Sequence, residues 1–99
     1  MRTLEFGTQE LVQGLVTDLL KNDLNAVRDV VELAITTEDV EDAPASGWTL
    51  RDEVKMIGDY TILPSKLHTA SAKGHFKLWG RWGDPPEQVV LCIGKFRVI

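Results

Sequence analysis

GHFKLWGRWGDPPEQVVLCIGKF, residues 74–96, contains two of the three tryptophans and the single cysteine of this 99-residue chain. Side chains on a β-strand point alternately to its two faces, so the first half of the stretch predicts one apolar row and one basic row. The apolar row consists of Phe76, Leu78, Gly80 and Trp82, and the basic row of His75, Lys77, Trp79 and Arg81. Gly83-Asp84-Pro85-Pro86 is a turn signal, and the run after it is the most β-prone in the chain. We therefore predict a hairpin here, with Gly94 marking a bulge or bend in the second strand.

Two further turn signals lie in the C-terminal half of the chain. Gly58-Asp59 separates two short β-prone runs, and Ala72-Lys73-Gly74 immediately precedes the hairpin. Gly in such positions supplies the left-handed backbone that tight hairpin turns require. Three turns predict an antiparallel meander of four or five strands over residues 48–99.

Residues 8–36 favour a helical segment. Apolar side chains recur there at a spacing of four, which places them on one face of a helix, and Thr8 is a suitable N-cap. Asn22-Asp23 divides the segment, leaving open one kinked helix or a helical hairpin, of which we favour the hairpin. The fold class predicted is α+β in a single domain, 1–99: the helical segment, an acidic connector at 37–47, and the meander packed under the helices.

A winged helix is the alternative fold. Residues from Thr49 and from Ser65 could form two further helices before a hairpin wing at 75–99, an arrangement that binds DNA. Gly58 and Pro64 oppose it, because they interrupt the helices that it needs.

Composition is that of a globular domain, with 43% hydrophobic and 26% charged residues. We identify no apolar stretch able to span a bilayer and no signal peptide. A single cysteine fits a reducing compartment, so we expect a cytoplasmic protein without membrane contact. Cys92 has apolar neighbours, and we expect it to be buried.

Charge is divided unequally along the chain. Residues 1–42 carry three basic and ten acidic side chains (−7), and residues 43–99 carry eight basic and five acidic ones (+3), which together give the net charge of −4. Opposite halves of this kind favour either head-to-tail association or a basic binding face on an acidic body.

The sequence shows no catalytic, metal-binding or cofactor-binding motif. His68 and His75 could face each other across the turn at residues 72–74, but two histidines without a close partner are more typical of a protein surface than of a zinc site. We therefore expect no metal, no cofactor and no enzymatic activity.

The function predicted is that of a small non-enzymatic protein that binds another protein or a second copy of itself, as a regulator, inhibitor or assembly factor. The candidate partner-binding residues are His75, Lys77, Trp79 and Arg81. The alternative is a nucleic-acid-binding protein that uses the basic, tryptophan-bearing hairpin at 75–97, because an aromatic ring among cations can stack on a base.

Overall fold

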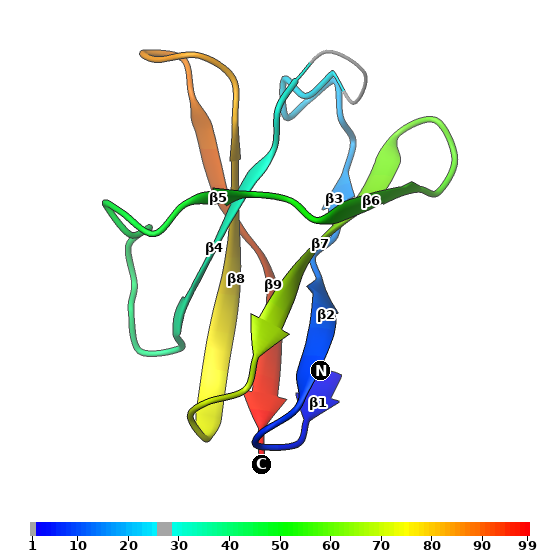
Figure 1. The fold of residues 1–99 in the computed structure, drawn as a ribbon. Helices are drawn as coiled ribbons and strands as arrows, with labels where there is room; N and C mark the ends of the chain where they lie inside the picture. Colours follow the sequence, from blue (N-terminus) through cyan, green and yellow to red (C-terminus); the bar gives the residue numbers. More distant parts are fainter. Residues whose placement is uncertain (1, 26–28) are drawn as a thin grey trace.

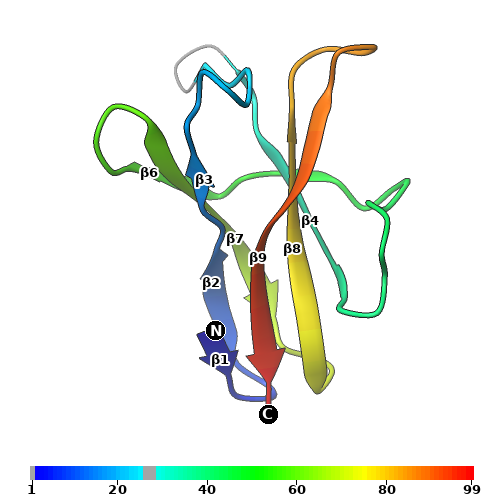
Figure 2. The same ribbon diagram turned by 180° about the vertical axis from the view of Figure 1, so that it is seen from behind.

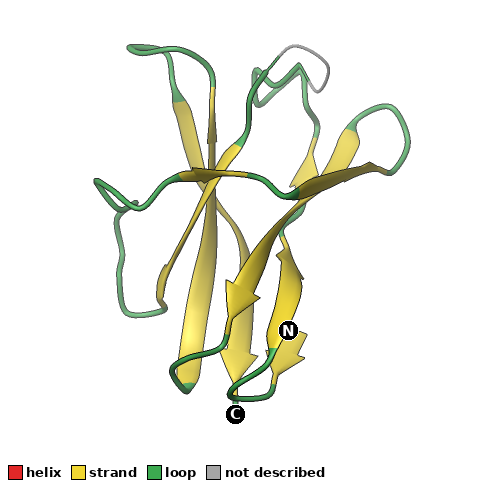
Figure 3. Cartoon of the chain, viewed as in Figure 1, coloured by secondary structure: helices red, strands yellow, loops and turns green. Residues whose placement is uncertain are grey.

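The computed structural model describes residues 2–25 and 29–99, and about 53% of this part of the chain is strand (Figure 3). None of the described residues is helical, so none belongs to a helix that could cross a membrane. The strands are β1 (Arg2–Leu4), β2 (Gln9–Gln13), β3 (Val16–Thr17), β4 (Glu32–Thr37), β5 (Thr49–Leu50), β6 (Glu53–Met56), β7 (Thr61–Thr69), β8 (Gly74–Trp82) and β9 (Val89–Val98).

The strands form two sheets that lie face to face (Figure 1). The first sheet has the order β1-β9-β8-β4-β5, in which β1 is parallel to β9 and the other pairs are antiparallel. In the second sheet β2 and β3 pair with successive parts of β7. β6 pairs with the other side of β7, since Ser65 is opposite both Gln13 and Glu53.

This connectivity corresponds to an immunoglobulin-like sandwich. β4, β8 and β9 take the places of strands C, F and G, while β2/β3, β7 and β6 take those of B, E and D. β1 differs from the seven-stranded pattern, because it pairs with β9 rather than with β2. The fold positions loops at the two ends of the sandwich but does not by itself indicate an activity.

One buried cluster fills the space between the sheets, and Ile93 belongs to it. A Cβ on Gly14 would come within 2.3 Å of Ile93, and a Cβ on Gly80 would come within 3.0 Å of it. Gly14, between β2 and β3 of the second sheet, therefore lets the facing sheets approach at Ile93, while Gly80, on β8 next to β9 in the first sheet, leaves room for the isoleucine side chain. The Leu15 amide donates to the Ile93 carbonyl at 2.9 Å, which joins the sheets by a backbone hydrogen bond.

The hairpin prediction is confirmed. Phe76, Leu78 and Trp82 of the apolar row are buried in the core, and β8 pairs with β9 across the turn at residues 83–88. The register shifts between Leu78 and Trp79, which leaves Ile93 as an extra residue beside Gly94. The bulge predicted in the second strand is therefore present.

The prediction of an N-terminal helical segment, and with it the α+β fold class, is wrong. Residues 8–36 contain β2, β3 and most of β4. Within this segment, residues 26–28 lie outside the described residues. Val12, Gly14 and Val16 all point into the core. A spacing of four is a multiple of the strand period of two, so the apolar repeat fitted both structures. Gly14 was the discriminating residue, since a glycine inside a helix costs about 1 kcal/mol relative to alanine.

The single meander is also wrong, as is the winged-helix alternative. β6 and β7 form the hairpin predicted at Gly58-Asp59, but the turn at Ala72–Gly74 carries the chain from one sheet to the other, because β8 pairs with β4 and β9. The apolar face of the first sheet, which the prediction covers with helices, is covered by a second sheet. The segments proposed as winged-helix helices are strands β5, β6 and β7.

Candidate functional site

The side chain of Trp79 is only 7% exposed, although it lies outside the core between the sheets. Its indole N–H donates to Thr36 Oγ1 of the neighbouring strand β4 at 2.8 Å. The Lys77 ammonium lies 5.6 Å from the ring centroid and also donates to the Val40 carbonyl at 2.8 Å. Trp79 is therefore packed within the outer face of the first sheet, and its ring is not open for stacking on a base.

Arg81 is held by an acid and by an aromatic ring. Its Nε and Nη2 donate to the two carboxylate oxygens of Glu32 at 3.2 and 3.3 Å. The guanidinium carbon lies 4.5 Å from the ring centroid of Trp48, and the Trp48 indole N–H donates to the Pro44 carbonyl at 2.9 Å. Arg81 thus joins β8 to β4 and to the end of the β4–β5 loop, residues 38–48.

His75 completes the basic row and faces the same loop. Glu38 lies 3.5 Å from His75 Nδ1 and 3.8 Å from Lys95 Nζ. All four candidate partner-binding residues, His75, Lys77, Trp79 and Arg81, therefore contact β4 or the β4–β5 loop. The opposite charges that suggested association between molecules meet here within one chain. We call this surface, the outer side of β8 with its contacts from residues 32–48, the covered face.

The two histidines do not form a pair. His68 is opposite Glu10 in the second sheet, whereas His75 is opposite Arg97 in the first. The His68 ring contacts Phe96, with ring centroids 5.1 Å apart. Burial lowers the pKa of His68 below its ordinary 6.5, and the nearby Lys66 lowers it further.

Metal-binding geometry is absent from residues 2–25 and 29–99: no group of three or more His, Cys, Asp or Glu side chains is arranged to hold an ion. Cys92 is exposed, so the prediction that it is buried is wrong. The residue lies on the outer side of β9 opposite Trp79.

The loops at one end of the sandwich form a second, very different surface. The described parts of the β3–β4 loop (residues 18–25 and 29–31), the β6–β7 loop (57–60) and the β8–β9 loop (83–88) lie in the upper part of Figures 1 and 2, away from the termini. We call this surface the loop end. It contains several large apolar side chains that the core does not accommodate.

An apolar groove of about 270 Å³ runs between the β3–β4 and β6–β7 loops. Leu19 and Leu24, both buried, line its base, while Leu20 is 75% exposed and Tyr60 57% exposed at its sides. Met56 is half exposed. The remaining lining residues are polar: Asn25 and Asp59.

An acidic pocket of about 470 Å³ lies between the β3–β4 and β8–β9 loops. Its lining residues are Asp23, Asp29, Gly83, Asp84 and Glu87. Asp23 also borders the apolar hollow formed by Leu19, Leu20, Leu24 and Asn25. The apolar groove and the acidic pocket are therefore neighbours on one surface.

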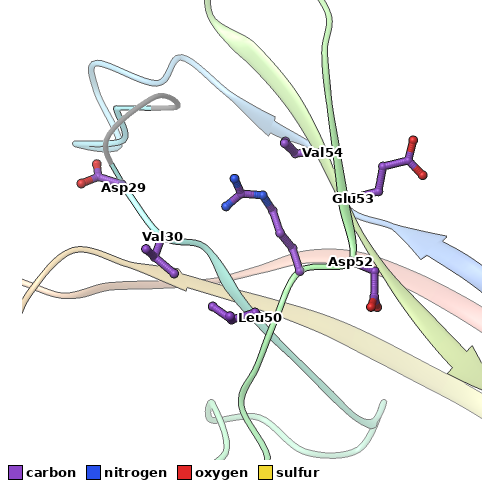
Figure 4. Close-up of a pocket in the computed structure, with 7 residues that line it drawn as sticks. Asp29, Val30, Leu50, Asp52, Glu53 and Val54 are labelled. Atoms are coloured by element: carbon purple, nitrogen blue, oxygen red, sulfur yellow. The ribbon is translucent and has the colours of Figure 1, made fainter.

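A further hollow, of about 490 Å³, opens beside the loop end where the chain passes from β5 to β6 (Figure 4). Val30 and Leu50 are both more than half exposed on one side of it, and Val54 and Glu53 lie on the other. Asp29 lines both this hollow and the acidic pocket. All of these hollows thus border the β3–β4 loop.

The core holds the first part of the β3–β4 loop in place. The Trp82 side chain is buried, and its indole N–H donates to the Asn22 carbonyl at 2.8 Å. The Asn22 side-chain amide donates to the Thr17 carbonyl at 2.7 Å, and the Leu24 amide donates to the Leu19 carbonyl at 2.7 Å. These contacts order residues 17–24 before a partner binds, which lowers the ordering cost of binding for this part of the loop.

The fold and this surface define a class: an immunoglobulin-like β-sandwich with exposed apolar side chains on the loops at one end. Comparisons with protein-family models, with curated proteins and with solved structures gave no match.

Sequence reasoning did not identify the loop end. Leu19, Leu20 and Leu24 were assigned to a helix face, and Met56 and Tyr60 to ordinary strands. One signal was present: apolar residues directly flank the turn at Gly58-Asp59, where polar residues are more usual.

Proposed function

We propose that this protein is a non-enzymatic binding module that holds another protein at the loop end. The observation that carries the proposal is the apolar groove, with Leu20, Met56 and Tyr60 exposed around a base of buried leucines. Exposed apolar side chains gathered around a hollow mark interaction sites more often than scattered ones do. Tyr and Met are also enriched in protein interfaces.

The covered face supports this choice of surface by contrast. Its aromatic and basic side chains already have partners within the chain, so a partner there would have to displace them. At the groove, by contrast, Leu20, Met56 and Tyr60 are already exposed. A role as regulator, inhibitor or assembly factor, and a reducing compartment such as the cytoplasm for the exposed Cys92 thiol, are parts of the same proposal.

Selection of displayed random peptides on the immobilised protein tests the proposal. We expect selected peptides to lose at least about tenfold in affinity for the double variant Leu20→Asp/Tyr60→Asp, because loss of a central interface side chain costs about 2 kcal/mol or more and tenfold corresponds to about 1.4 kcal/mol. The matched control is Phe6→Asp/Leu67→Asp, which removes two exposed apolar side chains elsewhere and adds the same charge. Peptides that bind all three proteins equally, or a selection that yields no groove-dependent peptide, would overturn the proposal.

A further inference from the structure

The charges around the groove indicate what kind of partner it fits. The groove and the three hollows beside it are lined by carboxylates, and Arg51 is the one cation among their described lining residues. The carboxylates are Asp23, Asp29, Asp52, Asp59, Glu53, Asp84 and Glu87. An anionic partner such as a nucleic acid or an acidic membrane surface would be repelled here.

We infer that the partner is a cationic protein segment with an apolar anchor, whose anchor side chain occupies the apolar groove while its Lys or Arg side chains lie over the acidic pocket. The inference rests on the proposed function and names the chemistry of its partner. Asp23 makes the arrangement contiguous, because it borders both the apolar hollow and the acidic pocket. A segment with a basic residue next to a leucine or aromatic residue can reach both at once.

The two parts of the surface contribute differently to binding. Burial of the anchor against Leu19, Leu24 and Tyr60 removes apolar surface from water and supplies most of the affinity. Carboxylates at an open pocket mainly speed association and select the partner, and their effect weakens as salt is added. We therefore expect binding to require the apolar groove and to weaken as salt is added.

Peptide arrays of three compositions test the inference. The first mixes Leu and Trp with Lys and Arg, the second replaces the cations with Glu, and the third keeps the cations but replaces Leu and Trp with Ser and Gly. We expect the wild-type protein to bind the first set, and binding to weaken at high salt. Preference for the second set, or equal binding of the first and third, would overturn the inference.

A matched pair of triple variants locates the charge effect. For a binding peptide of the first set we expect Asp23→Asn/Asp84→Asn/Glu87→Gln to reduce affinity on the order of tenfold at low salt. Asp23 has a φ of 52°, and asparagine tolerates this left-handed backbone, so the fold should survive. The control Glu5→Gln/Glu41→Gln/Asp42→Asn removes the same charge from exposed positions elsewhere and should leave affinity unchanged.

The outcomes separate the inference from the proposed function. If Leu20→Asp/Tyr60→Asp abolishes binding but the acid-neutralising variant and salt have no effect, the groove binds proteins and the inference about charge fails. If neither variant affects binding, both fail. Sedimentation of the free protein tests whether a second copy of the chain occupies the groove. Self-association that is abolished by Leu20→Asp/Tyr60→Asp would show this and would overturn the inference.

Discussion

The covered face and the loop end both place aromatic rings beside charged side chains, but only the loop end leaves its apolar side chains exposed. Trp79 on the covered face is 7% exposed, with its indole N–H bonded to Thr36, while Leu20 and Tyr60 at the loop end are mostly exposed. The β4–β5 loop supplies acids and carbonyls to the first surface. Composition alone therefore does not locate a binding surface, because the basic and aromatic side chains of a strand can all find their partners within the same chain.

The largest expected difference between core and loop end is in stability. Trp82→Ala should lower the free energy of unfolding by about 3–5 kcal/mol, since it empties a buried site and removes the donor to the Asn22 carbonyl. Tyr60→Ala should cost less than about 0.5 kcal/mol, as expected for an exposed side chain. Urea denaturation followed by circular dichroism measures both. Equal losses would mean that the loop end is packed in solution.

The covered face should show an intermediate effect. Thr36→Val removes the acceptor of the buried Trp79 indole N–H, and we expect a loss of about 1–3 kcal/mol because the donor is left unpaired. Thr37→Val is the matched control on the next, exposed residue. If both variants unfold at the same urea concentration, the indole N–H reaches water and the face is more open than described.

Acid should lower the free energy of unfolding through His68, which packs against Phe96 at the end of the sandwich opposite the loop end. The pKa of His68 is lowered from 6.5 in the folded chain, so the unfolded chain binds this proton first as pH falls. The contribution of His68 to stability is therefore complete above pH 6.5 and is lost progressively below it. His68→Gln should flatten the decline of unfolding free energy on acidification, measured by urea titrations at several pH values. An unchanged slope would assign the decline to other groups.

The smallest effect is expected where the covered face meets solvent. Glu38→Gln removes the charge between His75 and Lys95, both half exposed, and should cost less than about 1 kcal/mol. The loss should shrink further in high salt. Glu41→Gln, on an exposed residue of the same loop, is the control. A larger loss of unfolding free energy that does not depend on salt would mean that Glu38 is the main contact holding the β4–β5 loop on the sheet.

Part of the fold could be predicted from short stretches. The alternation along residues 75–82 and the turns at 58–59 and 83–86 were predicted correctly, because each depends on residues adjacent in the chain. The segment 8–36 was misassigned because a repeat of four fits a helix and a strand equally well. Gly14 distinguishes them, yet its role as the contact for Ile93 is visible only when the two sheets are brought together.

The candidate site shows the same limit. Leu19 and Leu24 of the β3–β4 loop line one groove with Met56 of β6 and Tyr60 of the β6–β7 loop, more than thirty positions along the chain. Whether each leucine is buried at the base of the groove or exposed at its side depends on which loops the strand order brings together at the loop end. The acid of Glu38 likewise reaches His75 only because β4 pairs with β8.

The sequence by itself determined the extended, two-faced character of residues 75–82, the hairpin turns and the unequal charge of the two halves. Strand pairing, including the parallel contact of β1 with β9, was decided by the tertiary structure, as were the covering of the basic row and the gathering of apolar side chains at the loop end. The physical reason is distance along the chain. Alternation and turn geometry are set by neighbouring residues, whereas pairing, burial and exposure depend on contacts that form only when remote segments pack together.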